Sequence, residues 1–172
     1  DDLTEAIKTL VVGDPLDEGT DVSALISHAE RDRVLAWVRE AEADGARVTT
    51  GGELSADGVL RPTLVVEARP DMKICSQEVF GPVVAVTTYE DFDEALRLAN
   101  DTQYGLQAGV FTRNLGTALK AAHNLDFGGV LINEVPTWRT EQQPYGGLRD
   151  SGSTREGPAW AVREMTDRKS VV

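Results

Sequence analysis

The sequence predicts an α/β fold with an open, mostly parallel sheet and helices on both faces. Segments with the apolar spacing of amphipathic helices alternate with short β-branched runs. From Pro82 to Asn133 the predicted order is strand, helix, strand, helix, strand. Parallel strands need crossover connections, which are almost always right-handed, so this order favours an open sheet. The runs at 83–88 and 130–132 are nearly continuous in apolar residues, as in strands covered on both faces.

Four segments place apolar side chains on one helical face. They are Leu3/Ala6/Ile7/Leu10, Val34/Trp37/Val38/Ala41, Phe92/Ala95/Leu96/Ala99 and Leu115/Ala118/Leu119/Ala122. The second has the clearest boundaries, because Ser27 followed by Glu30 forms a capping box and Gly45 stands where the helix should end. Asp91 with Glu94 repeats this start signal before the third helix.

Strands are predicted at four β-branched runs, Val59 to Val66, Val83 to Thr88, Ala108 to Phe111 and Val130 to Ile132. The long irregular segment 133–157 follows the last of them and is expected to be functional, because open α/β sheets bind ligands beyond the carboxyl ends of their strands. We expect one domain over residues 1–163. Residues 164–172 are predicted to form a terminal strand that pairs with another chain, since nothing nearby in the sequence can pair with it.

Composition narrows the classes of partner. The chain has 172 residues with 17 basic and 29 acidic side chains, a net charge of −12 that repels nucleic acid and anionic membranes. A single cysteine allows no intrachain disulfide, and no apolar stretch is long enough for a membrane span or signal peptide, so we expect a cytoplasmic protein. The sequence begins at Asp1 without methionine, and we expect it to be a piece of a longer protein.

Residues 77–83 read Gln-Glu-Val-Phe-Gly-Pro-Val and closely resemble the Glu-x-Phe-Gly-Pro signature of aldehyde dehydrogenases. Three further groups of residues resemble segments of that family in the right order, namely 13–22, 100–106 and 144–157. The resemblance covers essentially the whole chain. It implies the carboxy-terminal part of an aldehyde dehydrogenase catalytic domain.

In that family a cysteine thiolate attacks the aldehyde, hydride passes to a nicotinamide, and a glutamate-activated water hydrolyses the thioester. The family's order implies that the nucleophile and the base both precede residue 1. We therefore assign no catalytic residue here and expect the chain to be inactive alone. Cys75, the only thiol, is interpreted as a partly buried, inert cysteine.

The resemblance implies that Glu78 and Phe80 bind the cofactor, NAD or NADP. A carboxylate can accept both hydroxyls of a ribose, and an aromatic ring can pack against the nicotinamide. The alternative is a surface acid and a core phenylalanine. The residues that distinguish NAD from NADP are expected outside this chain.

The resemblance also implies that the loop from Asn133 to Tyr145 lines the aldehyde entrance, with Trp138 and Tyr145 as apolar walls. Arg139 offers a planar fork for a carboxylate or phosphate. A small, anionic or hydroxylated aldehyde such as lactaldehyde, glyceraldehyde 3-phosphate or phosphonoacetaldehyde is the expected substrate. The alternative for Arg139 is a solvated arginine paired with Glu134 or Glu141.

Gly146 and Gly147 are expected to allow positive φ and close backbone approach, and their spacing is not that of a dinucleotide fingerprint. His28 and His123 lack metal-ligand spacing, so no metal site is predicted.

Two other functions remain open. One is a non-enzymatic oligomerisation or binding domain derived from this fold. The other is a related reductase that forms aldehydes from acyl phosphates. The resemblance to aldehyde dehydrogenases also implies a homo-oligomer that is joined through the terminal strand.

Overall fold

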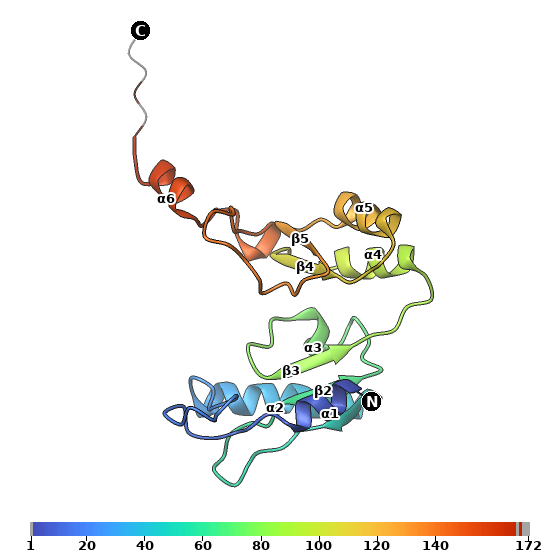
Figure 1. Ribbon diagram of the computed structural model, residues 1–172. Helices are drawn as coiled ribbons and strands as arrows, with labels where there is room; N and C mark the ends of the chain where they lie inside the picture. Colours follow the sequence, from blue (N-terminus) through green and yellow to red (C-terminus); the bar gives the residue numbers. More distant parts are fainter. Residues whose placement is uncertain (1, 168, 170–172) are drawn as a thin grey trace. The chain divides into compact units, whose positions relative to one another are not determined.

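The computed structural model describes residues 2–167 and Lys169. The chain divides into two compact units, Asp1–Thr88 and Tyr89–Val172, which we call unit 1 and unit 2. Each has its own sheet and its own helices (Figure 1). The units are described separately below.

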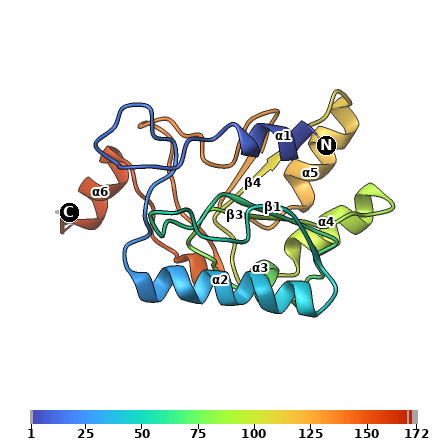
Figure 2. The ribbon, with the colours of Figure 1, turned by 90° about the horizontal axis from the view of Figure 1, so that it is seen from below.

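Unit 1 is a three-stranded sheet with helices on both sides. Its elements are α1 (Asp2–Lys8), α2 (His28–Ala43), β1 (Arg47–Thr50), β2 (Thr63–Val66), α3 (Lys73–Ser76) and β3 (Val83–Val86). The order is β1-β2-β3, with β1 antiparallel and β3 parallel to β2. Figure 2 shows α1 and α2 on opposite sides of these strands. The central strand is accordingly the most buried.

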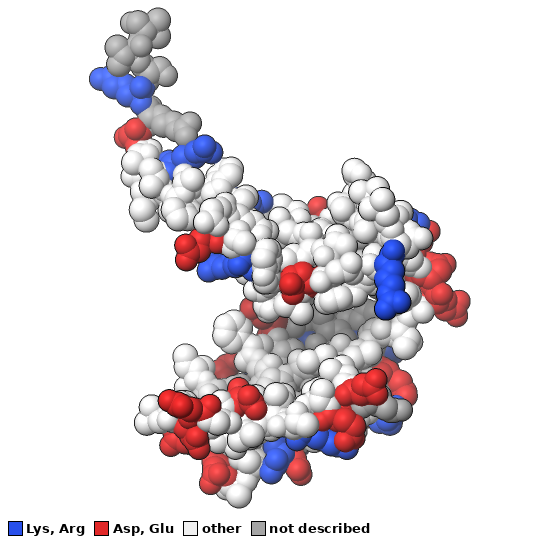
Figure 3. Space-filling view, viewed as in Figure 1, with Lys and Arg blue, Asp and Glu red and all other residues white. Residues whose placement is uncertain are grey.

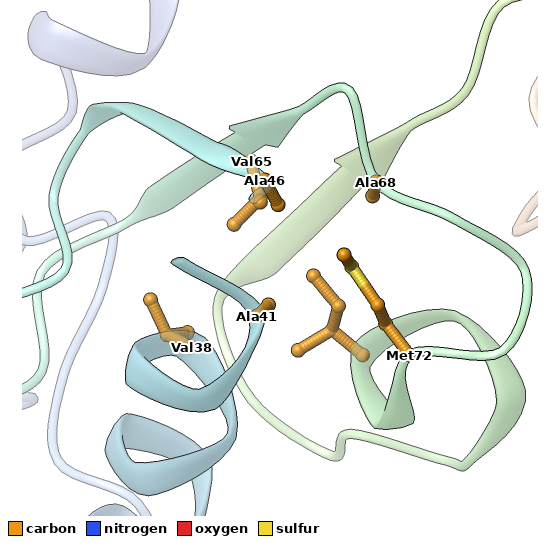
Figure 4. Packing of buried hydrophobic residues seen from close by; sticks show 7 residues of the cluster. Val38, Ala41, Ala46, Val65, Ala68 and Met72 are labelled. Atoms are coloured by element: carbon orange, nitrogen blue, oxygen red, sulfur yellow. The ribbon is translucent and has the colours of Figure 1, made fainter. Parts of the chain in front are cut away.

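The core of unit 1 lies between α2, α3 and the sheet. Val38 and Ala41 of α2 meet Val65 of β2, and Ala68 and Met72 close the cluster beside α3 (Figure 4). A second cluster joins Val34 and Leu35 of α2 to Leu60. Val34, Val38 and Ala41 belong to the apolar stripe that predicts this helix. Burying a side chain of this size contributes about 1.5–3 kcal/mol.

The predicted N-cap residues of two helices form the expected local hydrogen bonds. The Ser27 side chain accepts from the Glu30 amide at 3.2 Å, and α2 ends before Gly45, whose φ is +100°. At α4 (Phe92–Asn100) the Asp91 side chain accepts from the Glu94 amide at 2.8 Å. The Glu30 carboxylate does not complete a reciprocal box, because it pairs with Arg33 instead.

Unit 2 is built on two parallel strands. Its elements are α4 (Phe92–Asn100), β4 (Gln107–Val110), α5 (Leu115–Asn124), β5 (Gly129–Ile132), the short helix η1 (Arg149–Ser151) and α6 (Pro158–Glu164). β4 pairs with β5 from Gln107↔Gly129 to Val110↔Ile132. Leu96 of α4 and Ala121 of α5 form a cluster that packs against Ala108, Val110 and Val130 of the strands. Both helices thus cover one face of this sheet.

The other face of β4 is crossed by the segment after β5. A methyl group added at Gly109 would lie 2.7 Å from the Glu134 carbonyl oxygen and 3.0 Å from Pro136. At the start of β5, Gly128 is in contact with the Gly146 carbonyl. Glycine at these two positions lets the chain from 133 to 147 lie directly against the strand backbones.

The predicted α/β class and the parallel pairing are confirmed. The three strands predicted over residues 82–133 do not lie in one sheet. β3 belongs to the sheet of unit 1, whereas β4 and β5 form the sheet of unit 2. The run predicted from Val59 begins its ladder only at Thr63, because Pro62 lacks an amide hydrogen and Leu60 bridges to Leu54 instead. The sequence did not predict β1, α3 and α6, which are short elements without a distinct periodic pattern.

The predicted terminal strand falls partly on residues 168 and 170–172, which lie outside the described residues. Glu164, its first predicted residue, is the last residue of α6. The strand therefore remains a prediction for the residues after α6. In the described part of the chain, no helix has the length and apolar character needed to cross a membrane.

Candidate functional site

The first candidate site is the connection from α3 to β3, residues 77–82. Val79 packs against both core clusters of unit 1, whereas its neighbours Glu78 and Phe80 are exposed. The Phe80 side chain is 76% exposed. The interpretation of Phe80 as a core residue is therefore wrong. This loop is anchored by its middle residue and presents an acid and an aromatic ring to the solvent.

Phe80 has an unfavourable backbone conformation. Its φ is +54°, in the left-handed region that costs a non-glycine residue about 1–2 kcal/mol. Such a conformation persists only where the surroundings enforce it, and it occurs most often at functional sites. An exposed ring on a strained backbone gains nothing from core packing. It points to a binding role.

Contacts of the two residues that follow Phe80 hold the loop beside it. A methyl group at Gly81 would lie 3.2 Å from Val34 of α2, so a larger residue would fit only if the Val34 side chain shifted by a few tenths of an ångström. The Pro82 carbonyl then accepts from the Thr63 amide of β2 at 2.8 Å. The loop is thus held between α2 and the central strand of unit 1.

The exposed groups fit a nucleoside ligand with an apolar ring. Among the described residues, no hydrogen bond or ion pair engages the Glu78 carboxylate. Its two oxygens can accept two vicinal hydroxyls, and the exposed Phe80 ring offers a flat apolar surface. The arrangement can therefore hold a ribose beside a flat apolar ring.

The second candidate site lies in unit 2 and joins Arg139, Tyr145 and Glu156. Arg139 Nη1 donates to Glu156 Oε2 at 2.8 Å, and its guanidinium carbon lies 4.6 Å from the centre of the Tyr145 ring. Tyr145 and Glu156 are fixed by a backbone bridge in which each amide donates to the other's carbonyl. The three residues line a pocket of about 180 Å³ with Gln143 and Gly157.

Arg139 therefore pairs with Glu156 and not with the predicted alternatives Glu134 or Glu141. Its side chain is 50% exposed, and no other acceptor in the described structure binds its Nε or Nη2. Sequence reasoning missed Glu156 as a partner, because 17 positions separate the two residues and no periodic pattern links them. A planar guanidinium with donors to spare remains suited to a bound anion.

Trp138 lies in an adjoining pocket of about 400 Å³ beside β5, lined also by Asn133, Glu134 and Gln143. Gln143 lines both pockets. The structure thus brings Arg139 and Tyr145 together and places the half-exposed Trp138 next to them, not among them.

The glycine-rich segment 146–157 fixes the end of this loop. Gly146 contacts the Thr154 carbonyl, and a methyl group at Gly147 would lie 2.5 Å from the Ser151 Cβ. The predicted close approach is confirmed. The predicted positive φ is wrong for both glycines, and it occurs instead at Gly152 and Gly157.

Cys75 has the properties of an inert thiol. Burial, together with the negative charge of Asp71, raises its pKa above the ordinary value. At a given pH it therefore holds less of the reactive thiolate than a free cysteine does. No cluster of metal-ligating side chains occurs within residues 2–167 or at Lys169.

Alkylation should accordingly be slow at Cys75. We expect iodoacetamide to modify the folded chain more slowly than the urea-unfolded chain at pH about 8, close to the ordinary pKa of a thiol. The difference should shrink as the pH rises past the raised pKa, because the folded thiol then ionises as well. Mass spectrometry of timed samples measures both rates, and equal rates at pH about 8 would contradict the inert assignment.

The chain as a whole is similar to known proteins. The family model described as "Aldehyde dehydrogenase family" matches residues 1–171. The 3-sulfolactaldehyde dehydrogenase of Priestia aryabhattai is 44% identical over 170 residues, which are 99% of this chain and 35% of that protein. The chain therefore spans about a third of the length of the relatives that it matches.

Two solved structures extend the comparison. Aldehyde dehydrogenase 21 from Physcomitrella patens, in complex with the reaction product succinate, matches 94% of this chain and 34% of its own with a TM-score of 0.90 and 39% identity. A glyceraldehyde-3-phosphate dehydrogenase from Methanocaldococcus jannaschii, complexed with NADP, matches 95% of this chain and 35% of its own with a TM-score of 0.90 and 36% identity.

Proposed function

The chain belongs to the aldehyde dehydrogenase family, and on this premise we propose that it is the carboxy-terminal part of the catalytic domain of an NAD- or NADP-dependent enzyme. The complete protein would oxidise a small, anionic aldehyde to its carboxylate. The observation that carries this proposal is the pair Glu78 and Phe80, exposed on either side of the core-anchored Val79, with Phe80 at positive φ.

The roles of this chain follow from its own groups. A bound nicotinamide would accept hydride from the substrate. Glu78 would orient it by accepting the hydroxyls of its ribose, and the Phe80 ring would pack against it to fix the face that receives the hydride. The loop from Asn133 to Tyr145 would line the aldehyde entrance. No nucleophile is assigned here, and the nucleophile and base are expected in the rest of the protein.

A guanidinium beside a pocket supports the anionic substrate. The chain carries a net charge of −12, and Figure 3 shows Asp and Glu side chains spread over the face in view. An anion approaching such a surface is repelled, so its binding requires a nearby cation. Arg139 would supply it, because only its Nη1 pairs with Glu156 and no described residue engages its Nε and Nη2. The three relatives above are named for, or bind, 3-sulfolactaldehyde, succinate and glyceraldehyde 3-phosphate, which are all anions at neutral pH.

Other expectations for the complete protein remain predictions. They are a homo-oligomer joined through the residues after α6, a cytoplasmic setting, and the absence of nucleic-acid and membrane partners. The alternative of a non-enzymatic binding domain is less well supported. A purely structural domain would not need Glu78, Phe80 and the glycine-rich loop in combination.

The test is an aldehyde-dependent NAD(P)H absorbance assay on the complete protein, with this chain alone as a control. We expect activity in the complete protein and none in the chain. An Arg139→Met variant of the complete protein should raise the KM for an anionic aldehyde roughly 10- to 100-fold, because it removes a charge-assisted hydrogen bond. The KM for an uncharged aldehyde of similar size should change little.

Arg97→Met is the matched control, since it removes the same charge from an exposed position on α4. It should leave both KM values unchanged. Equal effects of Arg139→Met on charged and uncharged aldehydes would refute the anion-binding role. Absence of aldehyde oxidation by the complete protein would favour the non-enzymatic domain.

A further inference from the structure

Arg33 of α2 reaches the centre of the loop of residues 77–82. Its Nη2 donates to the Val79 carbonyl oxygen at 2.8 Å, across 46 positions of the sequence. That carbonyl belongs to the peptide between Val79 and Phe80, and Glu78 precedes it directly. One side chain of the helix thus holds the backbone between the two residues that are proposed to bind the cofactor.

The Arg33 side chain is itself held in place. Its Nε and Nη2 both contact Glu30 Oε2, at 2.9 and 2.7 Å, and its guanidinium carbon lies 4.4 Å from the centre of the Trp37 ring. Only 28% of the side chain is exposed. A guanidinium can bind a carboxylate, a carbonyl and an aromatic face at once, because its donors and its flat faces point in different directions.

The hydrogen bond from Arg33 lies directly before the strained residue Phe80. Rotation of the Val79–Phe80 peptide would let Phe80 leave its φ of +54°, and the bond from Arg33 opposes that rotation. A strained conformation persists only while such contacts outweigh its cost. Gly81 and Pro82 restrain the loop after Phe80, whereas Arg33 restrains it before Phe80.

We propose that Arg33 is a positioning residue, which orients Glu78 and Phe80 for the cofactor through the Val79 carbonyl. The proposal rests on the function proposed above for these two residues. Arg33 acts through the loop backbone, and Glu30 and Trp37 keep it in place.

The complete protein carrying Arg33→Met tests this role with two measurements. Hydrogen exchange should be faster than in wild type at the amides of Thr63 and Val83, which donate to the carbonyls of Pro82 and Gly81. The Kd for NAD or NADP, measured by calorimetry, should rise roughly tenfold, as expected for the loss of one charge-assisted bond. The KM for the aldehyde should stay unchanged. Arg33→Lys should restore part of the affinity, because one ammonium can still reach the carbonyl.

Arg31→Met is the matched control on the same helix. Arg31 donates to the Gly58 carbonyl at 3.1 Å and pairs with Asp32, so its loss loosens a different loop of unit 1. It should lower thermal stability as much as Arg33→Met does and leave cofactor affinity at the wild-type value. Equal cofactor affinities in the two variants would overturn the positioning role.

The two proposals fail in different ways. If Glu78→Gln weakens cofactor binding and Arg33→Met does not, only the positioning role is wrong. If Glu78→Gln itself leaves cofactor binding unchanged, the proposed function of the loop is wrong. Faster exchange at Thr63 and Val83 without loss of affinity would also overturn the proposal, because the loop would then move without consequence for the cofactor.

Discussion

Replacing Glu78 with glutamine is expected to weaken NAD(P) binding by the complete protein roughly 30-fold. The carboxylate offers two charged oxygens to the ribose hydroxyls, whereas the amide keeps one neutral oxygen. A hydrogen bond to a charged group contributes about 1.5–3 kcal/mol, and about 2 kcal/mol corresponds to roughly 30-fold in Kd. Titration of the complete protein with NAD and with NADP in a calorimeter measures the change.

Glu18→Gln provides the control for charge alone. Glu18 is an exposed acid in a loop of the same unit, and no ion pair engages it among the described residues. Its substitution should leave the Kd unchanged. Wild-type affinity in Glu78→Gln would remove the main support for a cofactor site at this loop.

Gly128→Ala should destabilise the chain by about 2–3 kcal/mol. The added methyl group would overlap the carbonyl of Gly146, which is a backbone atom and cannot turn aside like a side chain. Forcing extra volume into a packed site typically costs about 1–3 kcal/mol. The displaced segment carries Tyr145, so the Arg139 pocket should be disturbed as well. Denaturant unfolding of the variant and the wild type measures the stability difference.

The neighbouring glycine supplies the control. A methyl group at Gly129 would meet only the Gln107 side chain, at 3.3 Å, and that side chain can move. Gly129→Ala should therefore change the free energy of unfolding by less than about 1 kcal/mol. Similar losses in both variants would show that the contact between Gly128 and Gly146 is not what limits substitution here.

The helices were predictable because their signals are local. An apolar stripe such as Val34, Val38 and Ala41 must find a core, and Ser27 and Asp91 cap the helices that follow them through contacts three residues away. β1 carries no such signal. It pairs with β2 only because the chain returns through Gly51 and Gly52, both at positive φ.

The candidate sites were predictable in part. The motif at residues 77–83 identified Glu78 and Phe80, and the loop after β5 identified Arg139 and Tyr145. The partners of these residues were not predictable. Arg33 lies 46 positions from Val79, and Glu156 lies 17 positions from Arg139, so their contacts arise only once the sheets and loops are folded.

The sequence by itself determined the α/β class, the boundaries of α2, the start of α4 and the candidate residues of both sites, because periodicity, caps and motifs are properties of neighbouring residues. Only the tertiary structure decided that Phe80 is exposed and strained, that Arg33 holds its loop, and that Glu156 engages Arg139. These features depend on which distant segments meet. Close packing and directional hydrogen bonds settle that only in the folded chain.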